Sequence, residues 1–293
     1  MPERVVQTPK GLSIWSEAAG NPSDPPILLV NGATGQGIGW RRFADRLADE
    51  GRFVVLYDHR DTGLSSTVDF AASPYTLDDL AADAVAVLDG WGIDRAHVVG
   101  ASMGGMIAQL LAIDHPSRVR TLTSLISSPT GGEASGAVHG EAWEGTGLPG
   151  PTEEFVAAYT KLLAKAPETR EDWIELRVEM ARIAGSGAGP FDEEWIREVA
   201  AAEYDRAADW EAANNHVLAV TASTSRLDRL GSVSCPTLVV HGTADPVLPL
   251  PHGEATAAAI PGARLLAIDG MGHELPEWTW PQLLEAVLKH TTD

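Results

Sequence analysis

Cysteine and long apolar runs are scarce in this sequence. The single cysteine, Cys235, excludes an internal disulfide and a cysteine-rich metal site. No apolar run approaches the roughly 20 residues that cross a bilayer. The first residues lack the basic end and apolar core of a signal peptide. We therefore expect a cytoplasmic protein with no membrane partner.

Basic residues are also few. Lysine and arginine number 21 against 41 aspartate and glutamate residues, which gives a formal charge of −20. Such a surface repels phosphate backbones, so we expect no nucleic-acid partner. Apolar residues, by contrast, make up 44% of the 293 residues, which is ample for a buried core.

Short apolar runs alternate with segments of helical periodicity along much of the chain. The runs lie at residues 12–17, 27–30, 53–57, 97–100, 121–126, 237–240 and 264–268. The first alternates apolar and polar residues, as a half-exposed strand does, and the others are typical of strands covered on both faces. Strands that alternate with helices predict the α/β class, with a doubly wound and mostly parallel sheet.

The alternation stops after residue 126. Residues 152–227 have helical patterning that no strand-like run interrupts. We predict a core made of residues 1–130 and 230–293, with residues 131–229 inserted as a helical lid. The glycine-rich residues 184–190 are equally consistent with a hinge between lid helices and with an ordinary surface turn.

Ser102 stands in a pentapeptide of the form G-x-S-x-G, which spans Gly100 to Gly104. An apolar run precedes it and a helix-like stretch follows, which is the strand, turn and helix context that this motif requires. In such a turn the two glycines relieve collisions with the neighbouring strand and helix, and the serine hydroxyl points out of the sheet. We therefore predict that Ser102 is a nucleophile.

A nucleophilic serine needs a base and an acid that orients the base. Asp245 follows the apolar run 237–240, and His273 lies in a glycine-rich loop after the run 264–268. Both positions fall just past the carboxyl ends of predicted strands, where open α/β sheets place their sites. We predict that Asp245 is the acid and that His273, among nine histidines, is the base. His290, near the C-terminal end, is expected to be solvated.

The oxyanion of the reaction needs backbone N–H donors. One is expected from Met103, which follows the nucleophile, and the other from the loop after the strand at 27–30. Ala33 is our candidate in that loop, with Gly32 as the fallback. The loop lacks the nucleotide-binding glycine motifs. No metal or organic cofactor is expected, because the attacking group is a side chain activated by its neighbour.

Three further residues are candidates for the substrate pocket. Trp40 and Trp143 lie near the expected mouth of the pocket, and His216 lies in the predicted lid. For the two tryptophans, a place in the hydrophobic core is as good an interpretation as contact with a ligand.

The chain resembles the α/β-hydrolase superfamily, and within it the anthracycline ester hydrolases of the aclacinomycin methylesterase type. The likeness rests on residues 57–63, 69–75, 80–100 and 270–273. The family's triad corresponds to Ser102, Asp245 and His273. The resemblance implies removal of a methyl ester from a large polycyclic polyketide. Many relatives carry histidine where this chain has Asn31, and the likeness fades in the middle of the chain.

Other functions use the same scaffold. Lactone hydrolases and carbon–carbon bond hydrolases share the triad, so both remain alternatives. A non-catalytic receptor for small molecules on a hydrolase fold is an alternative from another class. The expected partner is a small-molecule ester, and the sequence does not specify an oligomeric state.

Overall fold

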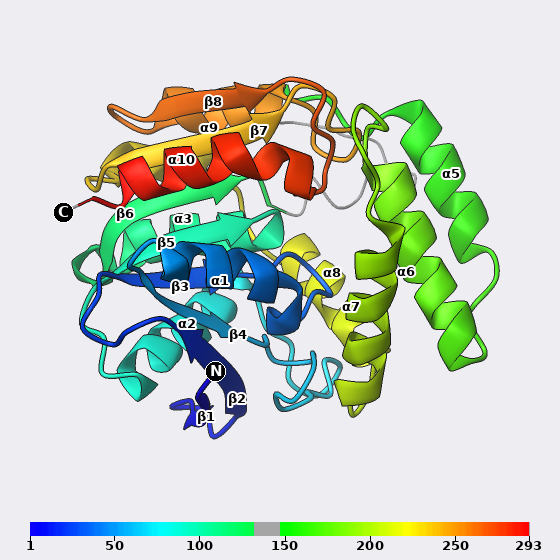
Figure 1. The fold of residues 1–293 in the computed structure, drawn as a ribbon, viewed down its shortest axis with the longest axis horizontal. Helices are drawn as coiled ribbons and strands as arrows, with labels where there is room; N and C mark the ends of the chain where they lie inside the picture. Colours follow the sequence, from blue (N-terminus) through cyan, green and yellow to red (C-terminus); the bar gives the residue numbers. More distant parts are fainter. Residues whose placement is uncertain (132–146, 293) are drawn as a thin grey trace.

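The computed structural model describes residues 1–131 and 147–292, and these residues contain one eight-stranded sheet. Its strand order is β1-β2-β4-β3-β5-β6-β7-β8 (Figure 1). The pairs β1/β2 and β2/β4 are antiparallel, and the remaining neighbours are parallel. The strands are β1 (Glu3–Gln7), β2 (Ser13–Ala19), β3 (Pro26–Val30), β4 (Phe53–Tyr57), β5 (Ala96–Ala101), β6 (Val119–Leu125), β7 (Thr237–Gly242) and β8 (Arg264–Ile268).

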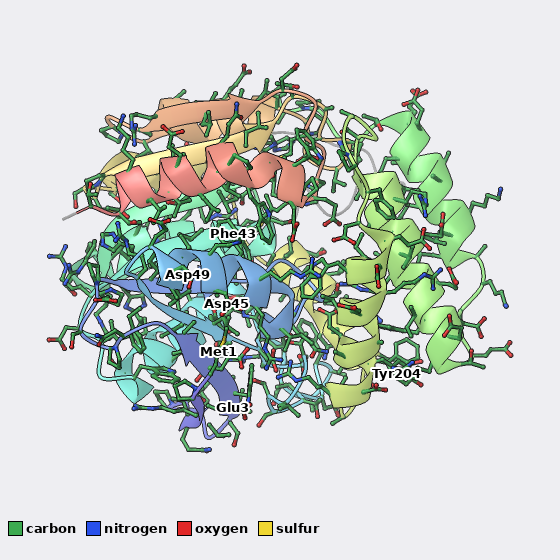
Figure 2. The ribbon with its side chains drawn as sticks, in the orientation of Figure 1. Met1, Glu3, Phe43, Asp45, Asp49 and Tyr204 are labelled. Atoms are coloured by element: carbon green, nitrogen blue, oxygen red, sulfur yellow. The ribbon has the colours of Figure 1, made fainter. Side chains whose placement is uncertain are left out.

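Helices cover both faces of the sheet, which confirms the predicted doubly wound α/β class. On the face toward the viewer in Figure 1 lie α1 (Arg41–Asp49) and α10 (Trp280–His290). Phe43 of α1, labelled in Figure 2, meets the rings of Trp40 and Trp280 edge-on. On the other face lie α2 (Leu77–Gly90), α3 (Met103–Asp114) and α9 (Pro251–Ala259). The central strands β3 and β4 are buried between these layers, apart from Pro26 at the start of β3, and their side chains are apolar on both faces.

Three strands differ from the sequence-based expectation. Strand β1 was not predicted, and it exists as an edge strand through its antiparallel pairing with β2. Strand β2 was expected to be half exposed, but its residues 14–19 are all buried. Strand β8 was expected to be covered on both faces, yet most of it is exposed because it forms the opposite edge of the sheet.

Four α-helices lie between β6 and β7 among the described residues. They are α5 (Glu153–Leu163), α6 (Arg170–Ala184), α7 (Glu193–Arg206) and α8 (Asn215–Thr221). Figure 1 shows α5, α6 and α7 side by side at one end of the sheet, with α5 outermost. Helix α8 packs Ala219 and Val220 into the main core cluster. The division into a core and a lid at residues 131–229 remains a prediction.

No helix among the described residues is long and apolar enough to span a membrane.

Candidate active site

Ser102 lies at the turn between β5 and α3 with a strained backbone, at φ 53° and ψ −120°. This turn fits only because its flanking glycines have no side chains. A Cβ on Gly100 would lie 2.1 Å from the carbonyl oxygen of Gly104, and one on Gly104 would lie 2.1 Å from that of Val30. Strain of this kind persists where the surrounding structure fixes it, typically at functional sites. The turn has the geometry predicted from the G-x-S-x-G motif.

The structure brings the three residues of the predicted triad together from distant parts of the chain. His273 Nε2 lies 2.9 Å from Ser102 Oγ, and His273 Nδ1 lies 2.8 Å from Asp245 Oδ2. Both distances are those of hydrogen bonds. The continuous chain from hydroxyl to imidazole to carboxylate is the arrangement in which a base takes the serine proton.

The loop after β7 fixes the Asp245 carboxylate. Its Oδ1 accepts hydrogen bonds from the backbone N–H groups of Val247 and Leu248, both at 2.9 Å. His241 lies beside it, with Nε2 2.6 Å from the carbonyl oxygen of Leu248 and 3.5 Å from Asp245 Oδ2. Because a carbonyl only accepts, His241 Nε2 carries the proton. Two backbone N–H groups therefore hold Oδ1, His241 holds the loop through Leu248, and Oδ2 faces His273.

The charge of the carboxylate sets the basicity of His273. Burial favours the neutral ring, but the charge of Asp245, its hydrogen bond and the charge of Glu274 together raise the pKa of His273 above its usual value. The side chain of His273 is 13% exposed and Ser102 is partly exposed. A substrate can therefore reach the base and the nucleophile.

Two backbone N–H groups near Ser102 are the candidates for the oxyanion hole. Met103 is the first residue of α3, so its N–H has no partner within the helix and lies at the positive end of the helix dipole. Ala33 lies in the loop after β3, beside Gly32, on which a Cβ would lie 3.5 Å from Ser102 Cβ. Within the described ranges, neither Met103 N–H nor Ala33 N–H donates a hydrogen bond to the protein. Both donors remain candidates for the oxyanion hole.

Two of the three predicted pocket residues are buried in the structure. Trp40 is only 8% exposed and packs edge-on against Phe43, so it belongs to the core and not to a pocket wall. His216 is fully buried, and both of its ring nitrogens are engaged in hydrogen bonds, so it cannot line an open pocket. Trp143 lies outside the described residues.

Three residues that the sequence analysis did not single out also lie at or near the site. Arg177 of α6 donates to Thr34 Oγ1 at 3.2 Å, in the loop that holds Ala33. Glu203 of α7 accepts from the backbone N–H of Gln36 at 3.1 Å in the same region. Glu274 is exposed and follows His273 directly. Of these three residues, only Glu274 could have been found from the sequence, because it lies next to the predicted base.

The glycine-rich residues 184–190 lie against the His273 loop. The backbone N–H of His273 donates to the carbonyl oxygen of Ala184 at 2.8 Å, and Ser186 Oγ donates to the carbonyl of Gly270. A Cβ on Gly189 would lie 2.5 Å from the ring of Trp278. Ala184 and Gly189 are thus packed against their neighbours, whereas Ser186, Gly187, Ala188 and Pro190 are exposed, so the segment is an anchored surface turn in this structure.

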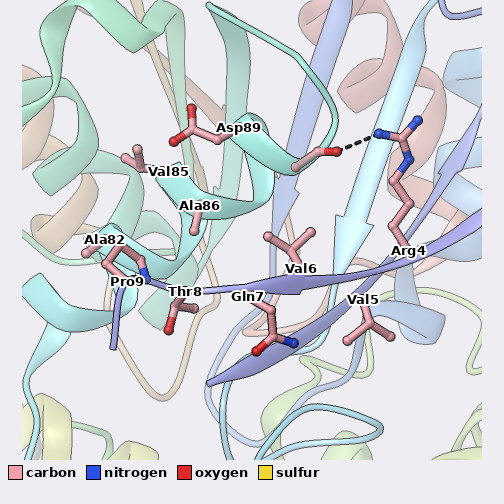
Figure 3. Close-up of a pocket in the computed structure, with 11 residues that line it drawn as sticks. Arg4, Val5, Val6, Gln7, Thr8, Pro9, Ala82, Val85, Ala86 and Asp89 are labelled. Carbon is pink, nitrogen blue, oxygen red and sulfur yellow. Dashed lines mark hydrogen bonds between the residues drawn. The ribbon is translucent and has the colours of Figure 1, made fainter. Parts of the chain in front are cut away.

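A surface hollow of about 670 Å³ lies elsewhere, between β1 and α2 (Figure 3). Its lining includes Arg4, Val6, Pro9 and Asp89. Arg4 reaches across to donate to the carbonyl oxygen of Gly90. None of the triad residues lines this hollow.

Comparison with known proteins places the fold in a family. The family described as alpha/beta hydrolase fold matches residues 25–279. The chain belongs to this family. It is 39% identical to the rhodomycin D methylesterase of Streptomyces peucetius, and 38% identical to that of Streptomyces sp. strain C5. Each alignment covers 99% of this chain and 98% of the relative.

A solved structure of a hydrolase from Pseudomonas aeruginosa superposes on this alpha/beta hydrolase with a TM-score of 0.71 at 26% identity. It covers 99% of this chain and 97% of the other. The resemblance to anthracycline ester hydrolases predicted from the sequence is confirmed by the two methylesterases. The predicted enzyme class, a carboxylic ester hydrolase, is confirmed with it.

Proposed function

We propose that this protein hydrolyses a carboxylic ester through an acyl-enzyme on Ser102, with His273 as the base and Asp245 as the acid that orients it. The observation that carries the proposal is the unbroken hydrogen-bonded chain from Ser102 Oγ to Asp245 Oδ2. The strained backbone of Ser102 supports it, because that geometry directs the hydroxyl away from the sheet.

The first step forms the acyl-enzyme. Ser102 Oγ attacks the ester carbonyl carbon while His273 Nε2 takes the hydroxyl proton. The carbonyl oxygen becomes an oxyanion, and the N–H groups of Met103 and Ala33 donate to it. Loss of one such donor typically costs about 3–4 kcal/mol of transition-state stabilisation. His273 then gives its proton to the departing alkoxide, and the alcohol leaves.

The second step releases the acid. Water attacks the acyl carbon as His273 takes one of its protons, and the new oxyanion occupies the same two N–H groups. Collapse of this intermediate returns the proton to Ser102 Oγ and frees the carboxylic acid. Asp245 stays ionised throughout and stabilises the imidazolium of His273 in both steps. The reaction calls for no metal or organic cofactor.

For the substrate, we propose the methyl ester of a bulky polycyclic polyketide. The support is the likeness to the two rhodomycin D methylesterases, whose alignments span almost the whole chain and so cover the segment between β6 and β7. That segment supplies helix α6, whose last residue, Ala184, accepts a hydrogen bond from the backbone N–H of His273. The alcohol released from such a substrate is methanol.

A paired hydrolysis screen tests this proposal. One set contains short p-nitrophenyl esters, and the other contains methyl esters of polycyclic aromatic polyketides. We expect turnover of the bulky methyl esters, and none by Ser102→Ala. A fluorophosphonate probe should label wild-type Ser102 and not the variant. Turnover of small esters alone would overturn the substrate class, and an unreactive Ser102 in folded protein would favour the receptor alternative.

A further inference from the structure

The loop that carries Ala33 is held in place from both sides by buried groups. We call residues 31–35 the oxyanion loop. At its start, the side-chain amide of Asn31 donates to the carbonyl oxygen of Tyr57 at 2.7 Å. The carbonyl oxygen of Asn31 accepts from His59 Nε2 at 3.2 Å. The first residue of the loop is therefore fixed by residues of β4 and of the segment that follows it.

Thr34, directly after Ala33, has a backbone conformation that is costly for a threonine. Its φ is +64°, in the left-handed region that β-branched residues rarely adopt. Such a residue persists only where its surroundings hold it. Here the Thr34 N–H donates to His216 Nδ1 at 3.1 Å, and Thr34 Oγ1 accepts from Arg177 at 3.2 Å. Both partners come from the helices between β6 and β7.

The hydrogen bonds of His216 fix its tautomer. Nε2 lies 2.8 Å from the carbonyl oxygen of Arg60, which can only accept, so Nε2 carries the proton. Nδ1 is then left with a lone pair, directed at the Thr34 N–H. The ring is fully buried, and burial lowers the pKa of His216, so the ring stays neutral and Nδ1 stays an acceptor.

We propose that His216 is a positioning residue for the oxyanion hole, acting through its Nδ1 acceptor on the Thr34 N–H. The peptide between Ala33 and Thr34 is held at its nitrogen by this bond, so the bond limits how the Ala33 residue can rotate. The Ala33 N–H then faces Ser102 before substrate arrives. The inference rests on the proposed function, because it concerns the same oxyanion.

Two near-isosteric variants separate this role from simple packing. In His216→Asn the side-chain oxygen can take the place of Nδ1 as the acceptor for Thr34, while the bond to Arg60 is lost. In His216→Gln the side-chain amide can take the place of Nε2 as the donor to Arg60, while the acceptor for Thr34 is lost. The matched control is Asn215→Ala on the same helix, because Asn215 donates to Asp61 and to Val68 at 3.1 Å and, in the described part of the chain, makes no hydrogen bond to the oxyanion loop.

The two variants are expected to differ in kcat. Since a whole donor is worth about 100-fold to 1,000-fold in kcat, a misplaced donor in His216→Gln should lower kcat by about 10-fold to 100-fold. KM should change little, because the loss falls on the transition state. His216→Asn should recover most of that loss. The inhibition constant of an alkylboronic acid, which forms a tetrahedral adduct on Ser102, should rise in proportion to the fall in kcat/KM.

The outcomes distinguish this inference from the proposed function. If wild type turns over p-nitrophenyl esters and His216→Gln behaves like Asn215→Ala, the positioning role is wrong and the esterase assignment stands. Equal loss in His216→Asn and His216→Gln, in step with lower melting temperatures, would also overturn it, because that pattern marks packing alone. If wild type hydrolyses no ester and Ser102 is not labelled, the proposed function is wrong. The positioning role is then wrong as well, because it depends on that function.

Discussion

The backbone N–H of His273 donates a hydrogen bond to the carbonyl oxygen of Ala184, 2.8 Å away. Ala184 is the last residue of α6, and His273 is the predicted base. The end of a helix between β6 and β7 thus fixes the backbone of the residue that must reach Ser102. The His273 loop can approach the end of α6 this closely because Gly272 has no side chain. A Cβ on Gly272 would lie 2.6 Å from the carbonyl oxygen of Ala184.

Gly272→Ala should therefore impair catalysis. The added methyl would also lie 2.7 Å from the backbone nitrogen of Ser186, and neither backbone atom can move independently of its chain. Displacement of His273 by about 1 Å can cost about 100-fold in rate, so we expect kcat/KM to fall by about 10-fold to 100-fold. Gly231→Ala is the control, because no heavy atom in the described part of the chain lies within 4 Å of its added Cβ. Equal activity of the two variants would contradict the prediction.

The pH profile should report the charge of Asp245. His273 must be neutral to accept a proton, and the neighbouring carboxylates raise its pKa against the effect of burial. We therefore expect kcat/KM to rise with pH through a midpoint above 6.5, the usual value for histidine. Asp245→Asn should move the midpoint down and lower kcat by about 10,000-fold.

Glu274→Gln gives the matched control for that profile. Glu274 raises the pKa of His273 by charge alone and forms no hydrogen bond with it in the described structure. The variant should lower the midpoint less than Asp245→Asn does and leave the high-pH plateau near that of wild type. A wild-type midpoint at or below 6.5 would show that burial outweighs the carboxylates.

Acid should destabilise the fold through His59. Burial, then the nearby His216, lowers the pKa of His59 to about 3. The unfolded chain takes up a proton near pH 6.5 and the folded chain does not until near pH 3. The stability is therefore complete above pH 6.5 and is lost as pH falls through that window, at about 1.4 kcal/mol for each pH unit.

His59→Gln isolates this contribution. The glutamine amide can replace His59 Nε2 as the donor to Asn31, and it does not titrate. Between pH 7 and pH 5, urea unfolding should show wild type losing about 2 kcal/mol more than the variant. Parallel losses in the two proteins would mean that His59 is protonated in the folded state.

Arg206 should matter for stability far more than its surface neighbours. Its guanidinium donates to Asp58 at 3.0 Å, and the Asp58 side chain is fully buried. Removal of one partner of a buried pair typically costs about 3–5 kcal/mol, so Arg206→Ala should lower the melting temperature markedly. Arg170→Ala breaks the exposed pair with Asp205 and should have no measurable effect. Similar melting temperatures for the two variants would contradict this ranking.

The sequence predicted the triad because each member has a local signature at the end of a strand. Ser102 stands between glycines, and Asp245 and His273 follow apolar runs that became β7 and β8. The parallel order of β5, β6, β7 and β8 places these strand ends at one edge of the sheet. Local pattern and sheet topology together were enough to predict that these three side chains meet.

The sequence did not predict contacts that depend on how distant segments pack. His290 was expected to be solvated, but it is buried and Nε2 lies 3.1 Å from the carbonyl oxygen of Leu122, because α10 lies across the sheet. His216 was predicted to line a pocket because the sequence contains no pattern that shows α8 packing into the core. Strand β1 was missed because its apolar Val5 and Val6 are adjacent in sequence, and only the pairing with β2 makes it a strand.

Glu203 joins two parts of the molecule that a protein engineer would want to exchange separately. One of its oxygens accepts from Gln36 beside the oxyanion loop, and the other pairs with Arg177 of α6. A chimera that takes residues 131–229 from another hydrolase, to change the substrate range, would lose both contacts unless the graft keeps them. Such grafts should therefore retain Arg177, Glu203 and His216, and vary the outermost helix α5 first.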